Sequence, residues 1–173
     1  MIWFGWLFAS VGCGPSGQDV VMNLVTDNPV IREDSAKIAD NFPSDEVVSA
    51  LVAALADPSA TVRYHAIDSL IELDASVAVT SVIVLLQTEQ SPEVRQIAID
   101  ALGRFKDPSA VPYLVDLVTQ ATADPDEEVP LNAIWALGFI SDPSAMPLLS
   151  SLLDHADPYV VWNASRALKA LTL

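Results

Sequence analysis

The chain has 173 residues, of which 51% are hydrophobic and 18% charged, so it is long enough for one domain with a sizeable core. Its 23 acidic against 8 basic side chains give a formal net charge of −15, which excludes non-specific nucleic-acid binding and adhesion to anionic lipid through a basic surface. One cysteine excludes an intramolecular disulfide and an all-cysteine metal site. We therefore expect neutral or basic partners, no metal and no cofactor.

The first element is an apolar run over residues 2–11, which is too short to cross a membrane as a helix of roughly 20 residues. Its length is typical of the hydrophobic region of a secretory signal. The run leads into Gly12, Cys13 and a Gly/Pro/Ser stretch that cannot continue a helix. This junction resembles the signal peptide of bacterial lipoproteins, although Ser10 stands where that family favours leucine and no Lys or Arg precedes the run.

The lipoprotein resemblance implies that residues 1–12 are a signal peptide and that Cys13 is lipidated. Two or three acyl chains on Cys13 would hold the protein firmly, since each buried methylene contributes about 0.8 kcal/mol. We therefore expect a bacterial cell-envelope location, on the outer or inner membrane, with membrane contact through the lipid anchor only. The alternative is a cytoplasmic protein in which Cys13 is an ordinary buried cysteine.

Residues 13–43 are polar and acidic with only short apolar pieces, which predicts a tether behind Cys13. Within this stretch, residues 29–40 carry apolar side chains at loosely helical spacing. A capping helix that docks on the following domain is therefore an alternative for residues 29–40.

From residue 44 to residue 173 the sequence repeats one unit four times, at a period of 31 to 35 residues. Each unit holds Val, Ala four residues later and Leu four residues after that, which is one stripe along a helix. The recurring positions are Val62, Val94, Val129 and Val160; Ala66, Ala98, Ala133 and Ala164; and Leu70, Leu102, Leu137 and Leu168.

Asp or Ser followed by Pro precedes each of the four stripes. Both residues favour a helix start, the first by capping and the proline by its fixed backbone angle. Each stripe follows a second amphipathic segment. The pattern predicts four helical hairpins, over residues 44–73, 74–106, 107–141 and 142–173.

This combination of Asp-Pro, Val-Arg, Ala and Leu-Gly at such a period resembles the HEAT-like repeats of bacterial proteins, including those of phycobilisome lyase subunits. The resemblance implies an all-α fold, a right-handed α-α superhelix of about four helical hairpins whose second helices line the concave face. Because no hairpin buries its apolar stripe alone, neighbours share their stability. The family also implies an Asp–Arg ladder along the turns, for which Arg63 and Arg95 keep the arginine, whereas Pro130 and Val161 do not.

The repeat offsets along the second helices predict a binding surface on the concave face. Aromatic side chains there would anchor a peptide, and the acidic residues near the N-terminal end favour a basic segment as the partner. The partner-binding residues that we predict are Tyr64, Asp68, Gln96, Asp100, Trp135, Trp162 and Arg166. The alternative for Trp135 and Trp162 is a place in the core between repeats.

The sequence contains no recognisable catalytic or metal-binding motif. His65 and His155 are each followed by alanine, whereas deoxyhypusine hydroxylase, an enzyme of HEAT-like repeats, carries His-Glu pairs for its iron. The acidic residues Asp124 and 126–128 lack the alternating ligands and the glycine of a calcium loop. We therefore expect no enzyme and no metal site.

Together these features predict a monomeric HEAT-repeat lipoprotein of the bacterial envelope, a non-catalytic scaffold or adaptor that binds another protein. Because fold alone does not fix function, two alternatives stay open. One is a cytoplasmic structural or regulatory HEAT module, and the other is a lyase-type or chaperone-type subunit for a chromophore protein.

Overall fold

The structure is a computed structural model that describes residues 14–123 and 130–172, and within these ranges every regular element is helical. Short 3-10 turns precede or extend several of the α-helices. The α-helices are α1 (Gly17–Asn23), α2 (Pro29–Ile38), α3 (Asp45–Ala54), α4 (Ala60–Glu72), α5 (Val79–Leu86), α6 (Pro92–Phe105), α7 (Val111–Ala123), α8 (Leu131–Ile140), α9 (Met146–Ser151) and α10 (Pro158–Leu171). The predicted all-α class is confirmed.

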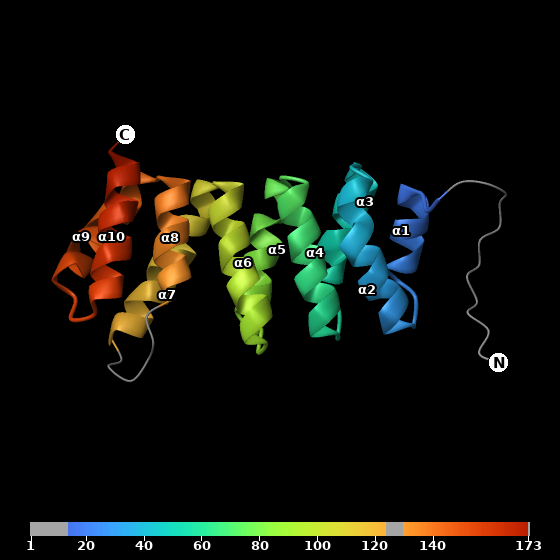
Figure 1. The fold of residues 1–173 in the computed structure, drawn as a ribbon, viewed down its shortest axis with the longest axis horizontal. Helices are drawn as coiled ribbons and strands as arrows, with labels where there is room; N and C mark the ends of the chain where they lie inside the picture. The colour runs from blue at the N-terminus through green and yellow to red at the C-terminus, as the bar shows by residue number, and fades with distance from the viewer. Residues whose placement is uncertain (1–13, 124–129, 173) are drawn as a thin grey trace.

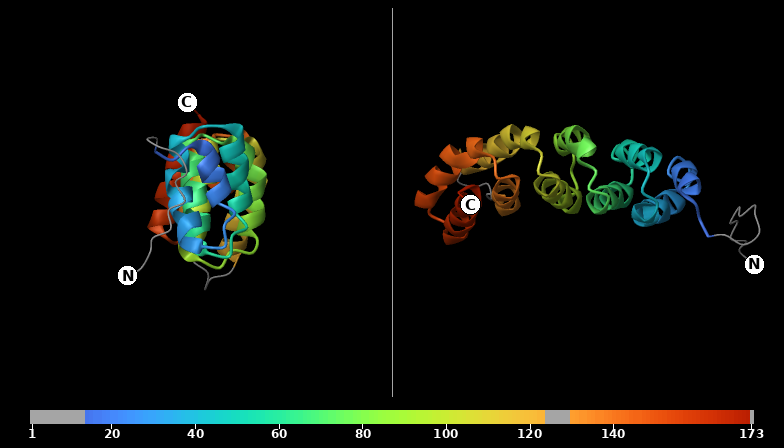
Figure 2. Two further views of the ribbon diagram at one scale, coloured as in Figure 1. Left: turned by 90° about the vertical axis from the view of Figure 1, so that its right-hand side faces the viewer. Right: turned by 90° about the horizontal axis from the view of Figure 1, so that it is seen from above.

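The helices stack side by side as a row of hairpins, from α1 at one end to α9 and α10 at the other (Figure 1). Seen from above, the row bends, and α3, α5 and α7 lie on its outer side (Figure 2). The second helices α2, α4, α6, α8 and α10 lie on the inner side of the bend and pack on one another in that order. The predicted solenoid is therefore confirmed, and its second helices form one continuous inner layer.

An additional hairpin, α1 with α2, precedes the four that the repeats predict. Val20 and Leu24 lie in the same core as Ala36 and Ala39, both of which are fully buried. The tether predicted for residues 13–43 is therefore wrong for this stretch, and the alternative of a docked helix over residues 29–40 agrees with α2. Cys13 and the expected signal peptide lie outside the described residues.

The predicted helix starts are visible in the caps. The Ser91 hydroxyl accepts a hydrogen bond from the Val94 amide at 3.4 Å, and the Asp157 carboxylate accepts one from the Tyr159 amide at 2.8 Å. Proline occupies the first turn of α2, α6 and α10, where no intrahelical donor is lost. These local signals fix where α2, α6 and α10 begin, and therefore which face each of them turns inward.

The Val-Ala-Leu stripe forms the core between hairpins, as predicted. At α4, α6 and α8 every described member of the stripe is at most 1% exposed. Val129 lies outside the described residues, and Leu168 in the terminal helix α10 is only partly buried. Burial of these side chains on both flanks of each inner helix fixes the positions of the residues on its free face.

Buried ion pairs join the first three hairpins across their turns. The Arg32 Nε lies 2.6 Å from the Asp57 Oδ2, and the Arg63 Nε lies 2.6 Å from the Glu89 Oε2. Asp57 and Glu89 also accept backbone amide hydrogen bonds from the turns that lead into α4 and α6, and the paired arginine holds the pKa of Glu89 below its ordinary value. The expected ladder is therefore present at Arg63, with Glu89 in place of aspartate, and it has an additional first step at Arg32. Arg95, which the sequence also assigned to the ladder, donates to a backbone carbonyl oxygen at 3.2 Å and pairs with no carboxylate of the described residues.

The later inner helices meet through glycine instead. A Cβ atom built on Gly103 of α6 would lie 2.9 Å from the Ala136 Cα of α8, and one on Gly138 of α8 would lie 2.9 Å from the Ala167 Cα of α10. Only a residue without a side chain permits such a close approach. The two glycines therefore set the spacing of α6, α8 and α10.

Candidate protein-binding groove

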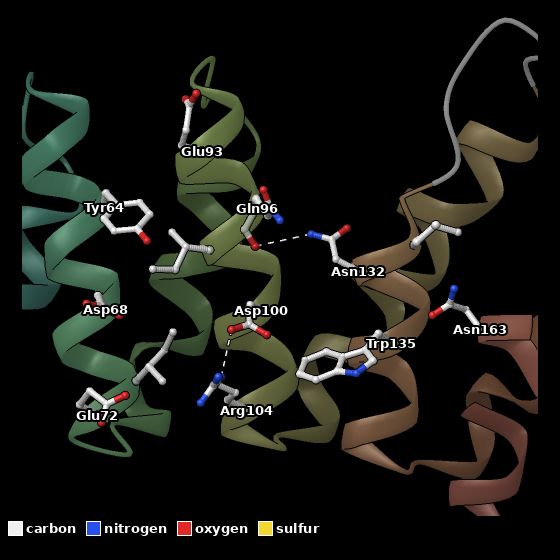
Figure 3. Close-up of a pocket in the computed structure, with 13 residues that line it drawn as sticks. Tyr64, Asp68, Glu72, Glu93, Gln96, Asp100, Arg104, Asn132, Trp135 and Asn163 are labelled. Carbon is white, nitrogen blue, oxygen red and sulfur yellow. Dashed lines mark hydrogen bonds and ion pairs between the residues drawn. The ribbon is translucent and has the colours of Figure 1, made fainter. Parts of the chain in front are cut away.

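A groove runs along the inner layer across α4, α6 and α8 and reaches α10 (Figure 3). Gln96 and Asp100 of α6 lie along its middle, and Ile97 of α6 also lines it. In Figure 3, Tyr64 of α4 points toward α6 from one side, and the Trp135 ring of α8 points back toward α6 from the other. Two aromatic side chains therefore flank a floor that carries polar and aliphatic side chains together.

The structure brings five of the seven predicted partner-binding residues together in this groove. They are Tyr64, Asp68, Gln96, Asp100 and Trp135. Trp162 and Arg166 of α10 do not line it; the Arg166 guanidinium lies over the Trp162 ring, 4.7 Å from its centroid. Trp162 instead lines a shallow depression with His155 and Pro158.

The alternative that Trp135 and Trp162 both lie in the core between repeats is wrong for Trp162 and holds only in part for Trp135. Trp162 is 55% exposed, so its assignment to the core between repeats is wrong. Trp135 is half-buried, and its ring packs against Phe139 with 4.0 Å between ring centroids while its free edge faces the groove. Trp135 therefore has both a packing contact and a surface that a partner can reach.

The groove is acidic toward its N-terminal end, as predicted. Asp68 and Glu72 project from α4, and Glu93 and Asp100 from α6. The Asp100 Oδ2 lies 3.0 Å from the Arg104 Nε, but the Arg104 side chain is exposed and the Asp100 side chain is only half-buried, so the pair contributes little to stability. Asp100 therefore keeps a carboxylate oxygen that can meet an incoming cation.

Sequence reasoning missed several lining residues, notably Glu93, Asn132 and Asn163. Asn132 donates to the Gln96 carbonyl oxygen at 3.5 Å, and Asn163 donates to the Tyr159 carbonyl oxygen at 2.8 Å. These two asparagines occupy equivalent positions of α8 and α10, so the repeat offset itself could have identified them. Their side-chain amides add hydrogen-bonding groups to a surface that the sequence presented as acidic and aromatic.

Neither histidine lies in the groove. The His65 ring packs edge-on against Tyr64, with ring centroids 5.3 Å apart, and burial lowers its pKa. The His155 Nδ1 accepts a hydrogen bond from the Asp157 amide at 3.0 Å. Across residues 14–123 and 130–172, no three His, Cys, Asp or Glu side chains gather as metal ligands. The acidic residues at 124–128 lie outside the described ranges.

The helices that the structure describes are all too short or too polar to cross a membrane.

The groove presents carboxylates, amides and aromatic rings on packed helices. Such a set binds and positions a ligand by charge, hydrogen bonds and contact area.

Comparison with solved structures gives three informative likenesses. A chain of the complex of CpcE and CpcF of phycocyanin lyase from Nostoc sp. PCC7120 is 29% identical, with a TM-score of 0.75 over 95% of this chain and 68% of that chain. A designed armadillo repeat protein in complex with peptide (KR)4 is 23% identical, with a TM-score of 0.61 over 88% and 80%. Human deoxyhypusine hydroxylase is 14% identical, with a TM-score of 0.50 over 90% and 96%. The last two likenesses show the fold alone.

Sequence comparison identifies the family. No curated protein matches the chain. A family model for HEAT repeats matches residues 48–123 and 115–173, which together are well over half of the chain and span α4 to α10. The predicted resemblance to the repeats of phycobilisome lyase subunits is confirmed by the likeness to the phycocyanin lyase complex. The chain therefore belongs to the HEAT repeat family.

Proposed function

We propose that the protein is a non-catalytic scaffold that binds another protein by holding a basic segment in the groove across α4, α6 and α8. The observation that carries this proposal is the meeting of carboxylates and aromatic rings on one face of a packed inner layer. The carboxylates attract and orient a basic segment, and Tyr64 and Trp135 offer contact area at low entropic cost.

The stiffness of the inner layer supports a binding role. The groove residues project from helices whose opposite sides are buried in the core, and not from loops. A surface that is already in its binding geometry loses little conformational entropy when a partner docks.

The comparisons support the same role. A designed solenoid of this fold was solved with the peptide (KR)4, whose residues are basic throughout. The related CpcE and CpcF chains were solved as a complex of two proteins. Both cases agree with a surface built for a protein or peptide partner.

The groove can be tested with labelled (KR)4 peptide and fluorescence anisotropy. We expect binding that weakens when both Asp68→Asn and Asp100→Asn are introduced, and that weakens as salt rises. Asp116→Asn is the matched control, because it removes the same charge from an exposed residue of α7 that does not line the groove. Capture of a partner from an envelope extract should follow the same order. Equal capture by all variants would contradict binding in the groove.

We also propose that Cys13 carries a lipid anchor in the bacterial envelope. Only Gly14, Pro15 and Ser16 separate Cys13 from α1, so the anchor would hold α1 within about 14 Å of the lipid surface, at 3.3 to 3.6 Å per residue. Globomycin-sensitive processing and labelled-palmitate incorporation that disappears in Cys13→Ala would support the anchor. An intact Met1 in protein purified from cells would instead support the cytoplasmic alternative.

A subunit of a chromophore lyase is the second candidate, because of the likeness to the CpcE and CpcF complex. This role predicts that the purified chain, together with its partner subunit, changes the amount of chromophore bound to phycocyanin. Absorbance of phycocyanin after incubation measures that amount. No change, combined with tight binding of a basic segment, would favour the scaffold.

A further inference from the structure

The charge of the inner layer changes sign along the row of helices. On α4, Asp68 and Glu72 face the groove, while Arg63 is already paired with Glu89. Helix α8 contains no charged residue, and α10 contains Arg166 and Lys169 with no acidic residue. The inner layer is therefore negative at α4, neutral and aromatic at α8, and positive at α10.

The change from negative to positive charge is also seen at a single position of the repeat, from one inner helix to the next. Asp68, Asp100, Trp135 and Arg166 occupy the same place in successive inner helices, so they form one row across the layer. Arg104 partly neutralises Asp100 in the second place of the row. A single extended segment lying across the inner helices would therefore meet all four positions in order.

The positive end of the row is available to a ligand. Arg166 and Lys169 are both exposed, and they lie three residues apart on one side of α10. The guanidinium carbon of Arg166 lies 4.7 Å from the centroid of the Trp162 ring. A guanidinium held over an aromatic face can still donate its N–H groups to a carboxylate.

We infer that the segment held in the groove is itself charge-segregated. Its basic residues lie against α4 and α6, an apolar or aromatic residue packs on Trp135, and its acidic residues meet Arg166 and Lys169. This inference rests on the proposed function and specifies the ligand of the same groove. A segment that is basic throughout would bring like charges together at α10, and such contacts oppose binding.

The geometry also sets the length of the segment. Neighbouring packed helices lie about 8–10 Å apart, so the three steps from α4 to α10 span about 24–30 Å. An extended chain advances about 3.3 Å per residue. A segment of about 7–9 residues therefore covers the row from Asp68 to Arg166.

Three labelled nine-residue peptides test this inference by anisotropy at low salt. KAKAWAEAE separates its charges around a central tryptophan, KAKAWAKAK is basic throughout, and KAEAWAKAE has the composition of the first peptide with its charges mixed. We expect the first peptide to bind about fivefold more tightly than either of the others, which corresponds to about 1 kcal/mol. Arg166→Glu should reverse the preference between the first two peptides. Lys106→Glu is the matched control, because it changes the same charge on an exposed residue outside the groove.

The outcomes separate this inference from the proposed function. If KAKAWAKAK binds at least as tightly as KAKAWAEAE and Arg166→Glu changes neither affinity, charge segregation is overturned while a groove for basic segments stands. If none of the three peptides binds but Asp68→Asn with Asp100→Asn abolishes partner capture, the inference is again overturned, because the partner then docks in a form other than an extended segment.

Discussion

Between α2 and α6 successive hairpins are tied by arginine–carboxylate pairs in their turns, whereas between α6 and α10 the inner helices touch through glycine. The first kind of junction works through long side chains that reach from one hairpin to the next. The second depends on backbones that approach too closely for any side chain. One repeated fold thus uses two different means of fixing the spacing of its units.

The groove lies where one kind of junction gives way to the other. Ile71 occupies in α4 the place that Gly103 and Gly138 occupy in α6 and α8, and Ile71 lines the groove. The glycine contact is therefore replaced by a branched side chain at the α4–α6 step. The change from glycine to isoleucine at this repeat position therefore affects the lining of the groove as well as the spacing of the helices.

Substitution of a contact glycine should have the largest effect on stability. Gly103→Val places a branched side chain against the Ala136 backbone, where even a Cβ would lie 2.9 Å from the Cα. We expect a loss of about 3 kcal/mol in the free energy of unfolding, measured by urea denaturation. Ile71→Val at the equivalent place in α4 is the control and should cost less than about 1 kcal/mol. Similar losses in both variants would show that the two junctions do not differ.

Loss of an arginine from the ion pairs in the turns should have the second largest effect on the free energy of unfolding. Arg63→Met leaves the Glu89 carboxylate, whose side chain is 2% exposed, without its cation. We expect a loss of about 2 kcal/mol, between the values for exposed and fully buried pairs. The double variant with Glu89→Leu should recover part of this loss, because it removes the unpaired charge. Losses that simply add in the double variant would contradict a coupled pair.

Acid should lower the free energy of unfolding by removing the contribution of the Arg63–Glu89 pair. Arg63 holds the pKa of Glu89 below its ordinary value, so the pair stabilises the fold fully above that value, about pH 4.3, and loses this contribution as the pH falls through the lowered pKa. The stability difference between the wild-type protein and Glu89→Gln should therefore shrink between about pH 6 and pH 3. A difference that stays constant over this range would contradict the assignment.

The smallest effect on stability is expected at the groove. Asp100→Asn removes the partner of Arg104 in an exposed pair, so the free energy of unfolding should change by less than about 1 kcal/mol. Its affinity for (KR)4 should nevertheless fall, because the lost carboxylate faces the groove. An unfolding free energy that changes as much as in Arg63→Met would assign Asp100 a structural role.

Repeated apolar positions made most of the fold predictable. Val, Ala and Leu recur at fixed offsets because each inner helix packs on two neighbours in the same way, and the Asp-Pro and Ser-Pro starts mark where those helices begin. The sequence did not predict that α1 and α2 form a further hairpin, because α2 carries Ser35 and Ala39 where later units carry Ala and Leu, although Arg32 occupies the repeat position of Arg63. Both polar residues are buried, and Arg32 is satisfied by Asp57, a partner 25 residues away that composition does not reveal.

The recurrence of residues at fixed offsets also made part of the candidate site predictable. Periodicity identifies residues that share a face, which is why Tyr64, Gln96 and Trp135 were found together. It does not specify how far a groove extends along that face, so Trp162 was assigned to the groove, whereas it lines a separate depression beside it. Contacts such as the Arg166 guanidinium over the Trp162 ring depend on local packing within α10.

Site-specific photo-crosslinking in cells shows directly whether a partner docks in the inner groove. A photoreactive amino acid replaces Gln96, which is exposed on the groove floor, or Val84 of α5, which is 58% exposed on the outer layer. We expect a crosslinked partner from position 96, whose capture a basic peptide reduces by competition, and no crosslinked partner from position 84. A partner captured from position 84 and not from position 96 would contradict binding through the inner groove.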